Sequence, residues 1–439
     1  MAGDDVEAIL TAALRQRHCP GAVVAISTGG KLRTIVGGST TTDADEPVDA
    51  GMWFEIGSVT KMLVATLVLQ HVARGDIALD DPVRAHVPEF RLADSRATDL
   101  VTIRHLLSHT SGIDTADDFT DTGSGDDCVS LYVDEAVVGS GLVHPVGARW
   151  SYNNAGYVVL GRLVELLDGR PWDIALDERI FGRCVMDAAN RRLAAARAVV
   201  TGHHVDPVTG AVDPVTKVMP ASVGPAGNVV ATAEALVRFA DCLFGETDEL
   251  LPTALVAEML TPQIAVRDTS QGLGWVLPDA PVPVAAHGGA TMGFTAFLGA
   301  IPSVRSSIAV VANGPGAGAI ALAVFAHLAG RRIEQPPLTT RPLDLDVARL
   351  VAGRYARRHV VQDIEPVDGR LVARTTFLGP AAELFAQPPV SELEPIDGNM
   401  SFVSRQPFAP DPARWDFFGP DGAGQPAGLF TQRVQVRPR

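Results

Sequence analysis

A serine and a lysine stand three residues apart at the head of a very apolar stretch, FEIGSVTKMLVATLVLQHVAR at 54–74. This spacing places Ser58 and Lys61 on one face of a helix. Apolar residues on nearly every side predict that the helix is buried, and burial lowers the pKa of an ammonium group. A lysine in that state can accept the serine proton and turn the hydroxyl into a nucleophile. The structural alternative is that Ser58 caps the helix and Lys61 extends to solvent.

The stretch WSYNNAGY at 150–157 offers two further polar groups just before a predicted helix. Tyr152 and Asn154 are two residues apart, so an extended segment presents the phenol and the amide on one side. Beside a cation, Tyr152 is expected to titrate below its usual pKa of about 10, which would help it move protons. Asn154 is expected to donate to Lys61 or to a substrate carbonyl. The alternative is a buried structural tyrosine with a turn asparagine.

The stretch AHGGATMGF at 286–294 ends one predicted strand and begins another. Gly288 and Gly289 let the backbone approach a bound ligand closely. The backbone N–H of Ala290 is a candidate oxyanion donor, with the N–H of the nucleophilic serine as the other. His287 adds a side chain at the end of the strand, and its alternative role is that of a hydrogen-bonded core or turn histidine.

The elements that must position these residues follow from hydrophobic periodicity. Helices are predicted at 4–17, 155–169, 232–245 and 317–330. Strands are predicted at 21–27, 32–38, 282–288, 293–301 and 306–313. The first two strands read as a hairpin. Strands at both ends of the region, with helices between them, predict one sheet in which the early hairpin joins the three late strands.

The pattern changes at a proline-rich stretch, 334–344, which is predicted to be a linker. Short alternating strands spaced by turn residues follow, as expected for a small all-β module. We therefore predict an α+β catalytic domain at 1–333 and a β-barrel-like domain at 345–439. The aromatic residues of this second domain are expected to form its own core: Phe377, Phe402, Trp415, Phe417, Phe418 and Phe430.

Composition excludes several classes of function. The 439-residue chain has a formal net charge of −15, which disfavours binding to nucleic acid or anionic lipid. Its longest apolar runs are shorter than the roughly 20 residues that span a bilayer, and its acidic N-terminus does not resemble a signal peptide. We therefore expect a cytoplasmic protein. Four scattered cysteines predict neither disulfides nor a zinc site: Cys19, Cys128, Cys184 and Cys242.

The three motifs together resemble those of the serine β-lactamase and penicillin-binding-protein superfamily: Ser58-x-x-Lys61, Tyr152-x-Asn154 and His287-x-Gly289. The likeness is greatest to the class C β-lactamase-like branch, and it covers roughly residues 5 to 330. It implies an antiparallel sheet flanked by helices and a helical lobe, with the active site in the cleft between them.

The resemblance also implies a role for each motif residue. Ser58 becomes the acylated nucleophile, while Lys61 and Tyr152 share the general-base and general-acid work. Asn154 positions Lys61 and the substrate. The N–H groups of Ser58 and Ala290 form the oxyanion hole. No metal or organic cofactor is needed for this chemistry.

His287 stands where the lactamase branch has a lysine. A histidine is mostly neutral at pH 7, so strong recognition of a β-lactam carboxylate is not expected. Histidine here resembles the esterase, peptidase and transacylase branches. Some members are stand-alone thioesterases of nonribosomal peptide assembly, with a histidine at this motif and a C-terminal lipocalin-like β module. Such enzymes accept a carrier-bound or thioester peptide that ends in a D-residue, which the peptide's own amine then attacks.

Other readings stay open at this point. A cytoplasmic esterase, or a peptidase or amidase for D-amino acids, would share the first half-reaction. A ligand-binding relative without catalysis is a third reading. The acidic stretch at 114–127 could hold an incoming ammonium, although a solvated surface loop is the simpler interpretation. The sequence predicts a small-molecule or peptide substrate and leaves the oligomeric state open.

Overall fold

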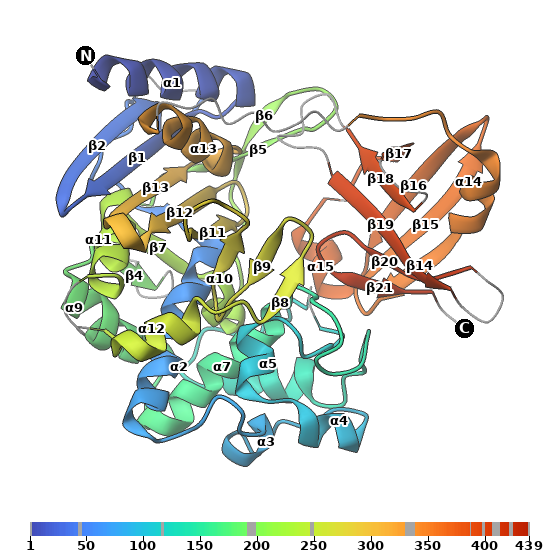
Figure 1. The fold of residues 1–439 in the computed structure, drawn as a ribbon, viewed down its shortest axis with the longest axis horizontal. Helices are drawn as coiled ribbons and strands as arrows, with labels where there is room; N and C mark the ends of the chain where they lie inside the picture. Colours follow the sequence, from blue (N-terminus) through green and yellow to red (C-terminus); the bar gives the residue numbers. More distant parts are fainter. Residues whose placement is uncertain are drawn as a thin grey trace.

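The protein consists of a large body of sheet and helices beside a closed barrel, drawn in orange and red in Figure 1. The computed structural model describes residues 2–42, 46–115, 118–190, 199–245, 250–329, 339–386, 388–396, 400–405, 413–420 and 425–437. This arrangement confirms the predicted α+β class with a small all-β unit at the C-terminal end.

The large body is built on an eight-stranded antiparallel sheet in the order β2-β1-β13-β12-β11-β10-β9-β8. Its strands are β1 (Gly21–Thr28), β2 (Lys31–Gly38), β8 (Ile264–Val266), β9 (Thr269–Gln271), β10 (Val276–Pro278), β11 (Ala285–Ala290), β12 (Thr295–Ile301) and β13 (Ser306–Ala312). Pairing of β1 with β13 confirms that the early hairpin joins the late strands. The short strands β8 to β10 extend the sheet beyond what the sequence predicted.

Helices cover both faces of this sheet (Figure 1). The first and last helices of the body, α1 (Ala2–Arg17) and α13 (Ala317–Leu328), share a core with one face. On the other face lies α11 (Ala233–Leu243), whose N-cap Thr232 accepts a hydrogen bond from the Ala235 N–H at 3.1 Å. These three helices confirm those predicted from hydrophobic periodicity at 4–17, 232–245 and 317–330.

A helical lobe lies below the sheet, with two central helices that bring the first two motifs together. They are α2 (Thr60–Arg74) and α7 (Asn154–Asp168), and each ends at a left-handed glycine. The smaller elements of the body are β3 (Phe54–Glu55), α3 (Val83–His86), α4 (Ser95–Leu100), α5 (Ile103–Leu107), α6 (Cys128–Tyr132), α8 (Trp172–Leu176), α9 (Gly182–Cys184), β4 (Ala188–Asn190), β5 (Gly202–Val205), β6 (Val212–Val215), α10 (Gly224–Gly227), β7 (Val229–Ala231) and α12 (Thr253–Met259).

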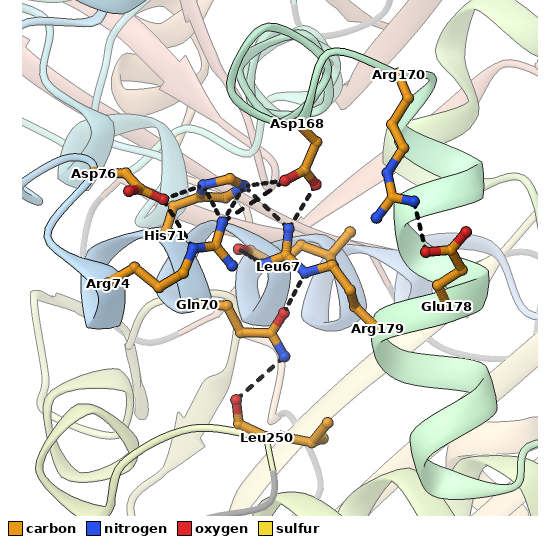
Figure 2. Close-up of polar contacts among 10 residues, drawn as sticks. All are labelled: Leu67, Gln70, His71, Arg74, Asp76, Asp168, Arg170, Glu178, Arg179 and Leu250. Carbon is orange, nitrogen blue, oxygen red and sulfur yellow. Dashed lines mark hydrogen bonds and ion pairs between the residues drawn. The ribbon is translucent and has the colours of Figure 1, made fainter.

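A charged cluster joins the C-terminal ends of α2 and α7 (Figure 2). His71, which has no exposed surface, lies 2.9 Å from the Asp76 carboxylate and 3.4 Å from that of Asp168. Arg179 donates to Asp168 at 2.6 Å and contacts the His71 ring at 3.1 Å. The cluster therefore fixes the ends of α2 and α7 that lie opposite the motif residues.

The barrel closes through eight antiparallel strands: β14 (Gly353–Arg357), β15 (Val360–Val367), β16 (Arg370–Phe377), β17 (Ser391–Pro395), β18 (Ser401–Ser404), β19 (Ala413–Pro420), β20 (Pro426–Phe430) and β21 (Val434–Val436). The helix α14 (Leu345–Val351) packs into its core, and α15 (Gly379–Leu384) follows β16. Of the predicted linker at 334–344, residues 334–338 lie outside the described residues.

Only part of the aromatic set forms the barrel core. Phe402, Trp415 and Phe417 are buried there, as predicted. Phe430 instead contacts Trp150 of the large body, with ring centroids 5.8 Å apart, and Arg149 lies 4.1 Å above the Phe418 ring. The prediction of one common core was therefore wrong for the aromatic residues that face the other domain.

The acidic stretch that follows α5 anchors the barrel. Asp118 is 1% exposed, and its carboxylate accepts hydrogen bonds from His359 at 3.0 Å and from the Thr120 hydroxyl at 2.6 Å. Asp114 accepts from the Arg358 N–H at 2.9 Å. The interpretation of this stretch as a solvated surface loop was therefore wrong for Asp114 and Asp118, because the barrel covers both.

Replacing Asp118 by alanine should lower the free energy of unfolding by about 3 kcal/mol, because it leaves buried donors without their acceptor. Burial raises the pKa of Asp118, but hydrogen bonds from His359 and Thr120 outweigh it and hold the pKa below its usual value. The contribution is therefore present at neutral pH and is lost as the pH falls through that lowered pKa. Urea unfolding at pH 7 and pH 3 measures both effects.

Glu392 provides the control for this prediction, because its ion pair with Arg370 at 3.3 Å is exposed on both sides. Its replacement by alanine should change stability by about 0.5 kcal/mol or less. Equal effects of the two substitutions would show that Asp118 does not anchor the barrel.

None of the described helices is long and apolar enough to cross a membrane. The four cysteines all lie in the described part of the chain and none forms a disulfide, and burial raises the pKa of Cys19 to about 12. Within the described ranges, His, Cys, Asp and Glu side chains form no group of three or more that could hold a metal ion.

Candidate active site

Ser58 and Lys61 meet at the start of the central helix. Ser58 lies in the short turn η1 (Gly57–Val59), directly before α2, and the Lys61 Nζ lies 3.1 Å from its Oγ. Lys61 has no exposed surface, so it does not extend to solvent. Burial, with a smaller contribution from the positive charge of Arg433, holds the pKa of Lys61 well below its usual value. The amine is therefore suited to accept the serine proton.

A backbone carbonyl, rather than Asn154, holds the lysine. Lys61 donates to the Ala226 carbonyl of α10 at 2.6 Å. Asn154 is 8% exposed at the first position of α7, and its expected hydrogen bond to Lys61 is not formed. Its neighbour Asn153 caps the helix instead, because its side chain accepts from the Gly156 N–H at 3.0 Å. No sequence pattern predicts this role for Ala226, because any residue can supply a backbone carbonyl.

Tyr152 lies beside the amine, but its acidity differs from the prediction. The Lys61 Nζ is 4.9 Å from the centroid of the Tyr152 ring. Burial raises the pKa of Tyr152 to about 12, and the nearby Ser58 hydroxyl and the Arg433 charge offset this only in part. The expectation of a pKa below 10 was wrong because the phenol is desolvated. Tyr152 is therefore a neutral phenol at pH 7, suited to donate a proton.

His287 reaches the same site from β11. Its ring centroid is 6.3 Å from that of Tyr152, and its Nδ1 donates to the Gly288 carbonyl at 2.6 Å. Burial, followed by the charge of Lys61, lowers the pKa of His287 to about 4. The imidazole is therefore neutral at pH 7, as the sequence predicted, and it supplies no positive charge to a ligand.

Two glycines bring the candidate oxyanion donors together. Gly57 has a φ of +52°, and a Cβ atom there would lie 2.6 Å from the Ala290 nitrogen. A Cβ atom on Gly289 would lie 1.9 Å from the Ile56 oxygen and 3.2 Å from the Ser58 nitrogen. Only glycine permits this approach of β11 to the turn η1. The backbones that carry the N–H groups of Ser58 and Ala290 therefore lie side by side.

The barrel contributes a positive charge that the sequence did not predict. The turn between β20 and β21 places the Arg433 guanidinium 5.1 Å from the Tyr152 ring centroid. The Gln432 carbonyl accepts from the Tyr152 N–H at 3.2 Å, and the Ser151 Oγ accepts from the Val434 N–H at 3.0 Å. An arginine in a distant hairpin has no spacing relation to the motifs, so only the folded structure reveals it.

The site therefore combines a desolvated amine, a neutral phenol and a neutral imidazole with one nearby guanidinium. Such a site can form an acyl-enzyme at a serine, because the amine can take the proton and the backbone N–H groups of Ser58 and Ala290 can bind the developing oxyanion. The structure brings together Ser58, Lys61, Tyr152, His287 and the backbone of Ala290, as predicted. The predicted hydrogen bond from Asn154 to Lys61 is absent from this site.

Comparisons with known proteins agree with this geometry. A family model described as Beta-lactamase matches residues 6–331. Penicillin-binding protein 4 of Amycolatopsis lactamdurans is 36% identical over 370 residues, covering 78% of this chain and 94% of that protein. Esterase EstB of Burkholderia gladioli is 37% identical over 186 residues, 39% of this chain and 47% of the esterase. The crystal structure of SurE matches 99% of both chains with a TM-score of 0.75 and 25% identity, and SurE has also been solved with D-Leu.

Proposed function

Since this chain belongs to the beta-lactamase family, as a serine hydrolase of that group, we propose that it transfers peptidyl groups ending in a D-residue through an acyl-enzyme at Ser58. The observation that carries the proposal is the buried Lys61 amine, 3.1 Å from the Ser58 hydroxyl. The acyl donor is a thioester, with esters and amides as related substrates.

In the first step, the Ser58 Oγ attacks the acyl carbonyl while the neutral Lys61 amine takes its proton. The negative charge that develops on the carbonyl oxygen is bound by the N–H groups of Ser58 and Ala290. The carbonyl re-forms as the bond to the leaving group breaks, and Tyr152 gives the leaving group its proton. Lys61 then returns a proton to Tyr152, which restores both groups.

In the second step, an amine or a water molecule attacks the ester on Ser58. The nucleophile loses a proton, and the Ser58 oxygen regains one as it leaves. An amine at the other end of the peptide gives a macrocycle, whereas water gives the linear acid. One feature supports a peptidyl thioester over a β-lactam: His287 is neutral, so it offers no positive charge to a β-lactam carboxylate. The D-Leu bound in the related SurE structure supports D-selectivity.

The alternative function is simple hydrolysis of a small ester or a D-amino-acid amide. The likeness to esterase EstB, which covers 39% of this chain, supports this reading. Both functions use the same acyl-enzyme, so they differ only in what resolves it. We also propose that a carrier protein presents the thioester and binds at the side of the site that the barrel forms.

A peptidyl thioester with a free N-terminal amine should yield both a macrocycle and a linear acid, separable by mass. We expect the donor with a C-terminal D-residue to react at least about 100-fold faster than its L-epimer, because a misplaced carbonyl loses that much rate. The Ser58→Ala variant serves as the control and should form neither product. If every reactive donor gives only linear acid, the protein is a hydrolase and not a cyclase. If the D- and L-epimers react at the same rate, the proposed substrate class is wrong.

A further inference from the structure

His109 is a buried histidine without a role in the chemistry described above. It follows α5 and is 1% exposed. Its φ of +58° lies in the left-handed region, which few residues other than glycine adopt, although histidine is found there more often than most. A histidine held in this conformation beside a reactive centre requires a physical reason.

The contacts of His109 enclose the backbone of Tyr152 on both sides. The His109 carbonyl accepts from the Ser151 N–H at 2.9 Å, and its Nδ1 accepts from the Asn153 N–H at 3.1 Å. The residues before and after the tyrosine are therefore both hydrogen-bonded to this one histidine.

The His109 ring also packs directly against the phenol. Its centroid is 4.4 Å from that of Tyr152 and 5.2 Å from that of Tyr157, and both contacts are tilted rather than flat. The Lys61 amine lies over both tyrosine rings, 4.9 Å from one centroid and 5.6 Å from the other. One face of Tyr152 is therefore fixed by an imidazole within the group of rings that surrounds the amine.

The imidazole stays neutral in this position. Burial is the main cause that holds the pKa of His109 well below its usual value, and any positive charge on Lys61, on His287 or on Arg433 adds to it. Because Nδ1 accepts the Asn153 N–H, the neutral ring carries its proton on Nε2. If Nδ1 were protonated, its N–H would face the Asn153 N–H, which is also a donor. The hydrogen bond between them therefore forms only when the imidazole is neutral.

We propose that His109 is a positioning residue that fixes the place and orientation of Tyr152 by holding the backbone on both sides of it and packing against its ring. The inference rests on the proposed role of Tyr152 in proton transfer. In this role His109 does not contact the substrate. A histidine suits this left-handed position because its imidazole supplies both an acceptor for the Asn153 N–H and a flat surface for the Tyr152 ring.

Two substitutions separate the acceptor from the rest of the side chain. His109→Ala removes both, and it should slow acylation by a fluorophosphonate about 100-fold per folded molecule, because a displaced catalytic group loses that much. His109→Asn tolerates the left-handed backbone and places an amide oxygen near Nδ1. It should recover at least about tenfold of the loss, the range for a buried donor that regains its acceptor. The fraction of folded protein comes from circular dichroism.

His144 provides a matched control, since it is 6% exposed and its Nδ1 bonds the Pro145 carbonyl at 2.8 Å. His144→Ala should lower the melting temperature to a similar extent but leave the labelling rate of the folded protein unchanged. Equal labelling of the wild type and His109→Ala, or no recovery by His109→Asn, would overturn the inference. A Tyr152→Phe variant labelled as fast as the wild type would instead overturn the proposed function.

Discussion

Replacing Lys61 by methionine should slow the acylation of Ser58 by about three orders of magnitude, because it removes the proposed general base. Methionine fits the site, since the lysine side chain is fully buried among apolar residues of α2. Burying an amine costs free energy that a thioether does not. The melting temperature should therefore stay equal or rise, which separates lost chemistry from lost structure. Labelling by a fluorophosphonate, followed by intact mass, measures the rate.

The pH dependence of the wild type follows from the same residue. Since Lys61 accepts a proton only when neutral, acylation should rise as the pH increases through its lowered pKa and then level off. The Lys61→Met variant should lose this acidic limb. Lys217 provides the control, because it lies on the surface and donates to the Glu383 carbonyl at 2.6 Å. If Lys61→Met labels as fast as Lys217→Met, Lys61 is not the base.

Replacing Gly289 by alanine should remove most activity and much of the stability. The added Cβ atom would lie 1.9 Å from the Ile56 oxygen, so β11 and the turn with Ser58 must separate. Separation of the two oxyanion donors by about 1 Å is expected to slow acylation about 100-fold. Loss of the close packing should lower the free energy of unfolding by about 3 kcal/mol. Thermal unfolding and labelling kinetics measure these effects.

Gly288 provides the matched control in the same strand. A Cβ atom there would find its nearest neighbour, the Ala296 oxygen, at 4.0 Å, an ordinary contact distance. Gly288→Ala should therefore leave the melting temperature unchanged. If the two variants unfold at the same temperature, the approach of β11 to the turn does not require glycine at 289.

The parts of the site that sequence alone predicted are those with local signals. Ser58 and Lys61 were recognised by their spacing in an apolar helix, and the sheet by strands that alternate with helices. The carbonyl of Ala226 and the guanidinium of Arg433 come from distant segments whose approach depends on tertiary packing. No local pattern encodes such contacts.

The acidity of Tyr152 illustrates a different limit. A cation was expected beside Tyr152, and hence a lowered pKa of the phenol. In the folded protein, the same burial that makes Lys61 a base also desolvates the phenol and raises its pKa to about 12. The direction of the shift depends on how much water remains, which a sequence motif does not specify. Asp118 was misread for the same reason, since the barrel that buries it is distant in sequence.

The turn between β20 and β21 touches the reactive centre from a domain that performs none of the bond making. Relatives could therefore diversify by exchanging or remodelling this hairpin while leaving the serine, the amine and the phenol untouched. Chemistry and selectivity would then evolve on separate modules. Grafting a foreign hairpin between Phe430 and Val434 becomes a natural starting point for redesign.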